Sequence, residues 1–367
     1  MARNTPFHEV GIEFGAQMRE LFGYWLPWDY ANGHVEEHLA TRQRVSVCDL
    51  DYMAECTIEG NDALAFIQQL FTNDFRDLSV GAIRYTAMCT ADGGMVDDGT
   101  VWRLDDSRFL YVSGDEADYD WVAEQSKGFD VVIKNITLEW TTLALQGPRS
   151  KDVLETLTDA ALDDIRYYHF IEGRVANVDC LIDRLGYTGE FGYELHFNPE
   201  HGEKMWRSLM GAGAACGIAP CGQAALESLR QEAGYILVGN EHDRNTSPLE
   251  AGIGWTVKFD KESFNGKDAL LKMLHRGLSR SLVWFKLSQD VVVSTGDPVL
   301  VGDQKIGHVT SSAYSPTFRR GIALAYVEPR FAIPGVEFSI GTAEGEHRAT
   351  LSTMPLYDPG DVRSKDW

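Results

Sequence analysis

Two neighbouring carboxylic acids follow a pair of glycines in the segment from Gly93 to Asp98, which reads Gly-Gly-Met-Val-Asp-Asp. The glycines permit a tight turn, and the apolar residues after Asp98 predict a strand. Because neighbouring side chains of a strand point to opposite faces, we expect only one of Asp97 and Asp98 to face any given pocket. A carboxylate in a dry pocket has a raised pKa and needs a partner, which suits acid–base chemistry. A hairpin turn with two solvated acids is the alternative interpretation.

A second segment, from Arg184 to Leu195, contains three glycines, three aromatic residues and two glutamates. Glycines in such a stretch let a ligand approach the backbone closely. Glu194, near its end, could accept two parallel N–H bonds from a flat heterocycle. A glycine-rich hairpin with exposed acids would give the same pattern.

Two more segments are less specific. The aromatic run from Asp164 to Phe170 could wall a planar ligand or pack in a core. The amphipathic stretch from Ala225 to Tyr235 predicts a packed helix that ends at Gly234. The ten histidines do not cluster at ligand spacing, so we expect no metal site. We find no phosphate-binding loop, zinc-protease motif or nucleophile elbow.

The elements that must position these residues alternate between helices and strands up to about residue 250. In the first 52 residues we expect a helix at Phe14–Phe22, a turn marked by Gly23 and Pro27, a helix at His34–Arg42 and a strand at Val45–Leu50. Further strands are expected at residues 56–58, 85–89, 99–103, 109–112, 143–145, 178–183 and 193–197. Further helices are expected at residues 62–71, capped by Asn61, and at 115–125, 150–157, 202–215 and 223–232. From about residue 278, short apolar runs alternate with turn residues, which predicts a small antiparallel barrel or sandwich.

Composition excludes several classes of protein. With 367 residues, 44% of them hydrophobic and 24% charged, the chain is globular and long enough for two or three domains. Its net charge of −22 makes nucleic acid and membrane surfaces poor partners. Lysine is absent before Lys127, and such an acidic surface suits either a saline environment or high solubility. No apolar stretch resembles a signal peptide or a membrane span, so we expect a cytoplasmic protein. The six cysteines lack metal-site spacing and are expected to be buried, reduced thiols.

Taken together and in this order, the segments resemble the glycine-cleavage T-protein (aminomethyltransferase) superfamily nearly end to end. The resemblance rests on Thr5-Pro6-Phe7, Gly23-x-Trp25-x-x-Pro27-x-x-Tyr30, Thr41-Arg42-x-x-x-Ser46-Val47-x-Asp49-Leu50, the turn from Gly93 to Asp98, Leu145-Gln146-Gly147-Pro148, Gly186-Tyr187-Thr188-Gly189-Glu190-x-Gly192-x-Glu194, Ser228-Leu229-Arg230-x-Glu232-Ala233-Gly234, Thr246-Ser247-Pro248-Leu249-Glu250-Ala251-Gly252 and Ile306-Gly307-x-Val309-Thr310-Ser311. Each motif is weak, but the set is specific.

The resemblance implies an α+β fold of three lobes around a central cavity that holds tetrahydrofolate, with a small antiparallel β-barrel as the last lobe. The corresponding domains are residues 1–52 with 142–250, forming a discontinuous folate-binding domain, then 53–141, a connecting segment at 251–277, and the barrel at 278–367.

The resemblance also implies roles for individual residues. Asp98 would lie beside the folate N5/N10 edge as the catalytic acid, and Glu194 would grip the 2-amino/N3 edge of the pterin. Met53, Tyr85 and Tyr187 would bind the pterin ring, and Leu226 stands where the family has an arginine that handles the folate tail. Candidates for the substrate pocket are Tyr52, Tyr168, His169, His196 and Tyr235.

Three departures from the family pattern concern the tail and substrate sides. They are Leu226 in place of that arginine, Tyr52 in place of a histidine, and Gly114 in place of an asparagine. They favour a paralogue that moves a methyl or methylene group from a small N-, S- or O-methylated molecule to tetrahydrofolate. Retained Asp98 favours an N-linked or formaldehyde-level carbon. Folate N5 would attack the activated carbon while Asp98 stabilises positive charge or relays a proton.

Two other functions stay open. One is the aminomethyltransferase of the glycine cleavage system, whose substrate is carried on the lipoyl arm of a partner protein. The other is a non-catalytic folate-binding protein, like the iron–sulfur-assembly relatives. Those relatives carry a lysine-glycine-cysteine signature that this sequence lacks.

Overall fold

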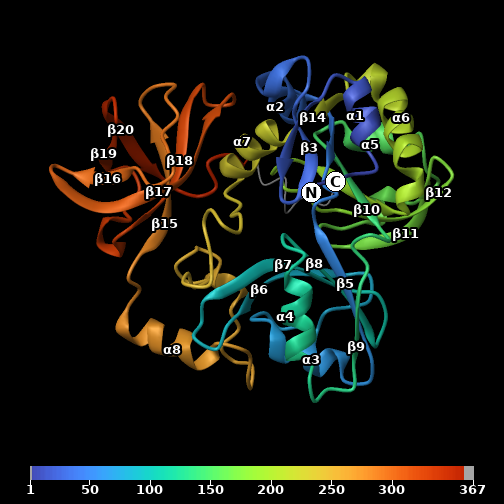
Figure 1. The fold of residues 1–367 in the computed structure, drawn as a ribbon, viewed down its shortest axis with the longest axis horizontal. Coiled ribbons are helices and arrows are strands. Elements are labelled where there is room, and N and C mark those ends of the chain that lie inside the picture. The colour runs from blue at the N-terminus through green and yellow to red at the C-terminus, as the bar shows by residue number, and fades with distance from the viewer. Residues whose placement is uncertain (1, 359–367) are drawn as a thin grey trace.

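The computed structural model describes residues 2–358 of the chain, which form three lobes (Figure 1). The first lobe is built on a six-stranded sheet in the order β11-β12-β13-β10-β4-β14. Its strands are β4 (Ser46–Asp49), β10 (Thr141–Gln146), β11 (Phe170–Val175), β12 (Val178–Asp183), β13 (Gly192–Phe197) and β14 (Ala219–Cys221). Because β4 pairs with β10, the chain leaves this sheet after β4 and returns to it about ninety residues later.

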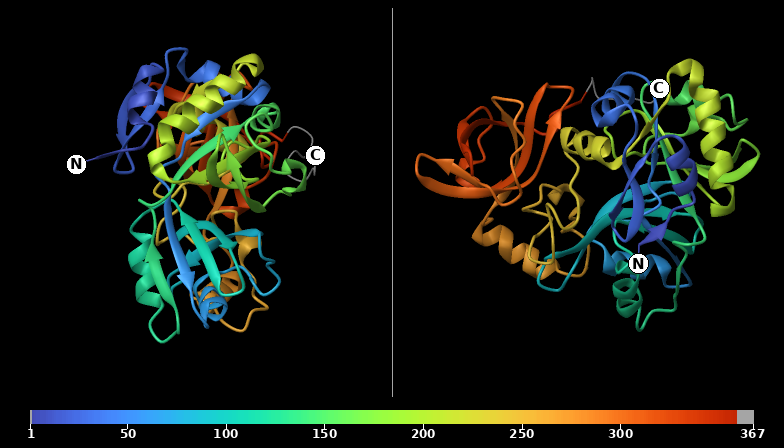
Figure 2. Two further views of the ribbon diagram at one scale, coloured as in Figure 1. Left: turned by 90° about the vertical axis from the view of Figure 1, so that its right-hand side faces the viewer. Right: turned by 45° about the horizontal axis from the view of Figure 1, so that its top comes forward.

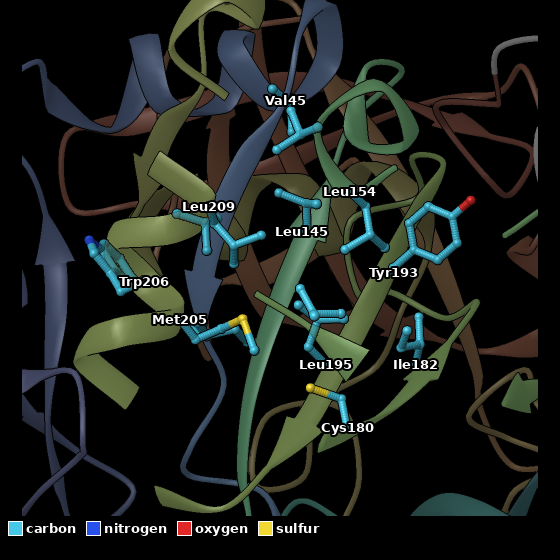
Figure 3. Close-up of a cluster of buried hydrophobic side chains, with 14 of the residues drawn as sticks. Val45, Leu145, Leu154, Cys180, Ile182, Tyr193, Leu195, Met205, Trp206 and Leu209 are labelled. Atoms are coloured by element: carbon cyan, nitrogen blue, oxygen red, sulfur yellow. The ribbon is translucent and has the colours of Figure 1, made fainter. Parts of the chain in front are cut away.

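The core of the first lobe lies between this sheet and its helices. Leu145 of β10 and Leu195 of β13 point toward α6 (Gly202–Gly213), where Met205 and Leu209 meet them (Figure 3). The short helix α5 (Ser150–Leu154) adds Leu154 to the same cluster. Burial of these side chains, at about 1.5–3 kcal/mol each, fixes the strands that carry site residues on their other face.

The N-terminal region differs from the prediction. Residues Phe14–Phe22 do not form a helix, because Gln17–Leu21 is strand β2, which pairs with β3 (Tyr24–Asp29) in a hairpin. Phe22 and Gly23 turn the chain with positive φ angles of 53° and 80°. Pro27 lies within β3 rather than in the turn, opposite the irregularity in β2 where a missing N–H is tolerated.

The remaining N-terminal elements frame the first lobe. Strand β1 (Arg3–Asn4) pairs with β3, and helix α1 (His8–Glu13) follows it. The predicted helix at His34–Arg42 is confirmed as α2 (Gly33–Gln43). The helix predicted at residues 223–232 is α7 (Gln223–Ala233), which ends at Gly234 with a φ of 81°.

The second lobe is a five-stranded sheet in the order β6-β7-β8-β5-β9, covered by two helices. Its elements are β5 (Ala54–Glu59), α3 (Ala63–Leu70), β6 (Ile83–Cys89), β7 (Met95–Arg103), β8 (Arg108–Ser113), α4 (Asp118–Gln125) and β9 (Val132–Asn135). The expected cap by Asn61 is wrong, because Asp62 occupies the N-cap position. The amide of Asn61 instead donates to Asp130 Oδ2 at 2.7 Å.

The third lobe confirms the predicted antiparallel barrel. Six strands close in the order β15-β18-β17-β16-β19-β20, and every pairing is antiparallel. They are β15 (Ser281–Leu287), β16 (Pro298–Val301), β17 (Gln304–Ser315), β18 (Arg320–Val327), β19 (Glu337–Thr342) and β20 (Gly345–Ser352). Helix α8 (Lys267–Arg276) precedes the barrel, and α7 packs beside β17 (Figure 2).

After the barrel, the chain returns to the first lobe. The backbone N–H of Tyr357 donates to the carbonyl of Glu232 at the end of α7. The ring of Tyr357 stacks on the guanidinium of Arg42, 3.9 Å from the ring centre. The six cysteines are free and buried, as predicted. No helix within residues 2–358 is long and apolar enough to cross a membrane.

Candidate active site

A cavity of about 320 Å³ lies between the first two lobes and the segments that lead to and from the barrel. Glu194 and Thr142 line it from the first lobe, and Asp98 and Tyr85 line it from the second. The segment after α7, the loop near Trp255 and the C-terminal residues Met354 and Pro355 complete the wall. The aromatic side chains on this wall are Phe22, Tyr52, Tyr85, Trp102, Tyr167, Tyr168, Tyr187, Tyr235 and Trp255.

The double-acid segment forms the start of β7, opposite β6. Gly93 turns the chain with a φ of 83°. Gly94 is required for another reason, because a Cβ there would lie 1.8 Å from the carbonyl oxygen of Arg244. Asp97 and Asp98 both border the cavity, but the Asp98 side chain is 16% exposed and the Asp97 side chain only 2%, in line with the expectation that one acid faces the pocket.

The two acids nevertheless have different surroundings. Asp97 is 1% exposed, and its carboxyl oxygens accept backbone N–H groups from Asp98 at 2.8 Å and Gly114 at 3.1 Å. Burial, with Asp118 and Asp98 nearby, raises the pKa of Asp97 well above its usual range. Burial therefore favours the neutral form of Asp97, and its hydrogen bond from Gly114 ties β7 to the end of β8.

Asp98 is the acid whose side chain is partly open to the cavity. Tyr85 donates its phenolic O–H to Asp98 Oδ2 at 2.6 Å. The imidazole Nε2 of His242 lies 2.6 Å from Asp98 Oδ1 and 3.7 Å from Asp97 Oδ1. These two contacts hold both oxygens and orient the carboxyl group beside the cavity, where a carboxylate can stabilise a positive charge.

Glu194 lies in β13 and faces the same cavity. Within residues 2–358, its carboxylate makes no hydrogen bond, although Asp183 and His196 are close by. Burial and the neighbouring Asp183 raise the pKa of Glu194 to about 8. A carboxyl group in this position is available to a ligand that offers adjacent N–H donors.

His196 also lines the cavity, two residues beyond Glu194 on the same strand face. Its Nε2 contacts Asp183 Oδ2 at 2.7 Å, and its Nδ1 contacts the hydroxyl of Thr142 at 2.9 Å. Burial lowers the pKa of His196 to about 4 and raises that of Asp183, so the environment favours the neutral form of both groups. Trp102 packs its ring edge-on against this imidazole at 4.9 Å.

Stacked aromatic rings form part of the cavity walls, and one of the aromatic residues on the wall has a strained backbone. The ring of Tyr187 stacks on Tyr235 at 5.5 Å, and Tyr85 stacks on Trp255 at 5.6 Å. Tyr168 has a φ of 60°, a left-handed conformation that is unfavourable for a bulky residue. Such strain clusters at functional sites, where the surrounding structure maintains it.

Most residues expected at the site line this cavity, but two do not. Met53, Tyr52, Tyr168, Tyr187, His196 and Tyr235 lie on the wall with Asp98, Glu194 and Tyr85. Leu226 is 2% exposed and packs in an apolar cluster with Tyr52 and Met53, outside the cavity lining. His169 is also outside it, with Nδ1 held by the carbonyl of Tyr167 at 3.1 Å.

Sequence reasoning missed His242, Asp183 and Trp255. No local pattern marks His242, because its partner Asp98 is 144 positions away. Two trios of metal-ligand type nevertheless come together: Asp97, Asp98 and His242, and Asp183, Glu194 and His196. Both histidines already contact a carboxylate of their own trio, so the hydrogen bonds account for the arrangement without an ion.

Comparison with known proteins places this geometry in a family. The model described as the GCVT N-terminal domain matches residues 7–261, and that of the glycine cleavage T-protein C-terminal barrel domain matches residues 280–358. The chain belongs to the glycine cleavage T-protein family. The resemblance seen in the sequence is thereby confirmed, as is the three-lobed fold with its barrel.

Related T-proteins share nearly the full length of the chain. An aminomethyltransferase of Halothermothrix orenii is 42% identical over 341 residues, which are 92% of this chain and 95% of the relative. One from Desulforamulus reducens is 37% identical, over 97% of this chain and 98% of its own. The crystal structure of glycine cleavage system aminomethyltransferase T from Bartonella henselae superposes with a TM-score of 0.91. It shares 28% sequence identity and covers 98% of this chain and 99% of that one.

These relatives favour a different donor from the one that the sequence departures suggested. Both relatives are named aminomethyltransferase, whereas the departures at Leu226, Tyr52 and Gly114 pointed to a small methylated molecule. The structure lessens the weight of two of these departures, whereas the third, Tyr52, lines the cavity. Leu226 lies outside the cavity lining, and Gly114 still donates its backbone N–H to Asp97.

Proposed function

We propose that this T-protein family member is an aminomethyltransferase. It moves the methylene carbon of an aminomethyl group, carried on a sulfur of the lipoyl arm of a partner protein, to N5 and N10 of tetrahydrofolate. The C–N bond breaks with release of ammonia, the C–S bond breaks to leave the lipoyl thiol, and the two folate N–H protons pass to these leaving groups as 5,10-methylene-tetrahydrofolate forms. The choice of donor is supported by the names of relatives that are 42% and 37% identical over nearly their whole length. A small N-, S- or O-methylated donor is the competing proposal that the test must exclude.

The observation that carries the proposal is the pairing of two different carboxyl groups in one cavity. Glu194 is without a hydrogen-bond partner in the described chain and faces the cavity. Asp98 faces it with both oxygens held by donors. The 2-amino/N3 edge of a pterin offers two adjacent N–H donors, which the carboxylate of Glu194 can accept in parallel. The residues present therefore fit a folate.

The apolar walls suit the flat ring of the same ligand. Met53, Tyr85 and Tyr187 line the cavity and supply slabs against which a heterocycle can stack. The O–H of Tyr187 donates to the carbonyl of Ile236, and that of Tyr85 donates to Asp98. Both rings are therefore held in place before a ligand arrives.

Bound tetrahydrofolate supplies the N5 and N10 nitrogens that accept the carbon. Glu194 and the aromatic walls hold the acceptor, and this proximity contributes up to about 7–11 kcal/mol to lowering the barrier. Asp98 stabilises positive charge at the transferring carbon and can take up a proton there, an effect worth about 10²–10⁴-fold. The packed aromatic side chains limit the access of water to the carbon in transit.

The test is a turnover assay by mass spectrometry under nitrogen. Purified protein is mixed with tetrahydrofolate and either an aminomethyl-lipoyl carrier protein or a panel of N-, S- and O-methylated small molecules. We expect 5,10-methylene-tetrahydrofolate with the carrier alone, and none with a carrier that lacks the aminomethyl group. Formation of 5-methyl-tetrahydrofolate from a free molecule, without turnover of the carrier, would instead establish a demethylase.

A further inference from the structure

The loop that carries His242 is anchored on both sides of this residue. On one side, Glu241 is 1% exposed and accepts hydrogen bonds from Arg230 of α7 at 2.7 Å and from Thr310 of the barrel at 2.8 Å. On the other side, Asp243 Oδ1 accepts from the N–H of Asn245 and the hydroxyl of Thr246, both at 2.9 Å. The backbone of His242 is therefore fixed relative to the first lobe and the barrel.

The same loop is attached to the second lobe, where Asp98 lies. The N–H of Met95, at the start of β7, donates to the carbonyl of Thr246 at 2.8 Å. The close approach of Gly94 to the carbonyl of Arg244 holds the two segments together at a second point. As a result the imidazole of His242 meets Asp98 across the boundary between lobes, with its side chain 0% exposed and that of Asp98 16% exposed.

The surroundings of Nδ1 in His242 indicate which of the two ring nitrogens carries the hydrogen. Nδ1 of His242 is buried and has no hydrogen-bond partner anywhere in residues 2–358. An N–H at that position would be a buried donor without an acceptor, which costs about 1–3 kcal/mol. A proton on Nε2 instead forms a short hydrogen bond to Asp98 Oδ1. The contacts therefore favour the tautomer with hydrogen on Nε2 alone.

We propose that His242 is a positioning residue that fixes the carboxylate of Asp98 by donating one hydrogen bond from Nε2. This inference rests on the proposed function, in which Asp98 faces the transferring carbon. Tyr85 holds the other oxygen, so the two donors together prevent the carboxylate from rotating. The nearby Asp97 does not compete for the imidazole proton, because its own oxygens accept backbone N–H groups and His242 Nε2 is 3.7 Å away.

His242 does not pass the proton on to solvent. A relay needs a second partner beyond the imidazole, and Nδ1 has none in the described chain. The role requires a donor at the Nε2 position but no group that titrates. Glutamine, whose amide nitrogen can reach the same place, should therefore replace His242, and leucine should not.

The kinetic experiment compares His242→Leu and His242→Gln with the wild type, using tetrahydrofolate and the aminomethyl-lipoyl carrier. We expect His242→Leu to lower kcat about 10- to 100-fold, the range for loss of one hydrogen bond to a charged group. The KM for tetrahydrofolate should stay within about twofold, because His242 holds Asp98 rather than the pterin. His242→Gln should retain kcat within about fivefold. An active His242→Leu variant, a glutamine variant as impaired as the leucine one, or a loss confined to KM would each overturn the proposal.

A second experiment does not depend on turnover. In the ¹⁵N spectrum of the wild type, recorded where the ring is neutral, the signals of His242, identified by their loss in His242→Gln, should show hydrogen on Nε2 and none on Nδ1. Hydrogen on Nδ1 of the neutral ring would overturn the proposal. A wild type without activity on the carrier would refute the proposed function, whereas this spectrum tests the hydrogen bond to Asp98 in either case.

Discussion

The guanidinium of Arg230 donates a 2.7 Å hydrogen bond to Oε2 of Glu241, and both side chains are 0% exposed. Ser311 of the barrel hydrogen-bonds to both partners, so this pair joins α7, the loop of His242 and the barrel. A buried ion pair is stable only when its remaining donors and acceptors are also hydrogen-bonded. Arg230 meets this requirement, because it also donates to Glu227 and to the carbonyl of Tyr235. The active-site loop is therefore held by a buried charge network.

Replacing Arg230 by methionine should destabilise the protein by about 3–5 kcal/mol, because Glu241 would be left as a buried charge without its partner. Urea unfolding followed by far-UV circular dichroism measures the loss. The matched control is Arg149→Met, which removes an exposed pair with Asp152 and should barely move the midpoint. Equal midpoints for the two variants would contradict a structural role for the Arg230–Glu241 pair.

Replacing Asp98 by asparagine should lower kcat about 10²–10⁴-fold and leave the affinity for tetrahydrofolate nearly unchanged. The neighbouring Asp97→Asn variant is the control. Because burial already favours the neutral form of Asp97, a neutral amide can replace its carboxyl group, and kcat should fall much less than in Asp98→Asn. Steady-state kinetics and equilibrium binding distinguish the two. A normal kcat in Asp98→Asn would remove this residue from catalysis.

Replacing Glu194 by alanine should abolish measurable binding of tetrahydrofolate, because the pterin edge loses its only carboxylate acceptor on this strand. Calorimetric titration provides the measurement, with the exposed Glu200→Ala as a control that binds normally. Micromolar affinity in Glu194→Ala would show that the pterin is held elsewhere.

Binding of tetrahydrofolate should release protons at neutral pH. The pKa of Glu194 in the free protein is about 8, so most of the carboxyl group is protonated at pH 7. Two N–H bonds from the ligand favour the carboxylate and lower this pKa in the complex. Affinity should therefore rise with pH up to about 8 and then level off. Calorimetry in two buffers of different ionisation enthalpy counts the protons, and a heat independent of buffer would contradict the assignment.

Local patterns predicted the parts of the fold that local physics determines. The barrel strands were visible because alternating apolar runs separated by turn residues have no good helical alternative. Helix α7 was visible because its apolar face and the glycine stop at Gly234 are sequence features. The hairpin at β2 was missed because Phe14, Met18 and Phe22 repeat at helical spacing. Pairing with β3 overrides that local preference.

The residues of the candidate active site also fall into those that the sequence could predict and those that it could not. Glu194 lies in a segment rich in glycine and aromatic residues, and Asp98 lies in a double-glycine, double-acid segment, so both could be singled out from the sequence. His242 and Asp183 could not, because each acquires its role from a partner that only the folded chain brings near. Strand alternation also separated the two acids, since the Asp98 side chain is 16% exposed beside the cavity and the Asp97 side chain only 2%.

The wall supplied by Met354 and Pro355 has a consequence for the synthesis of the protein. These residues line the cavity, yet they follow the last barrel strand in the sequence. The ribosome releases the chain from its N-terminus onward, and domains fold in that order. The first two lobes can therefore assemble before the last wall of the site has been synthesised. The cavity can close around a folate only once the barrel has been made and the segment behind it has packed against the first lobe.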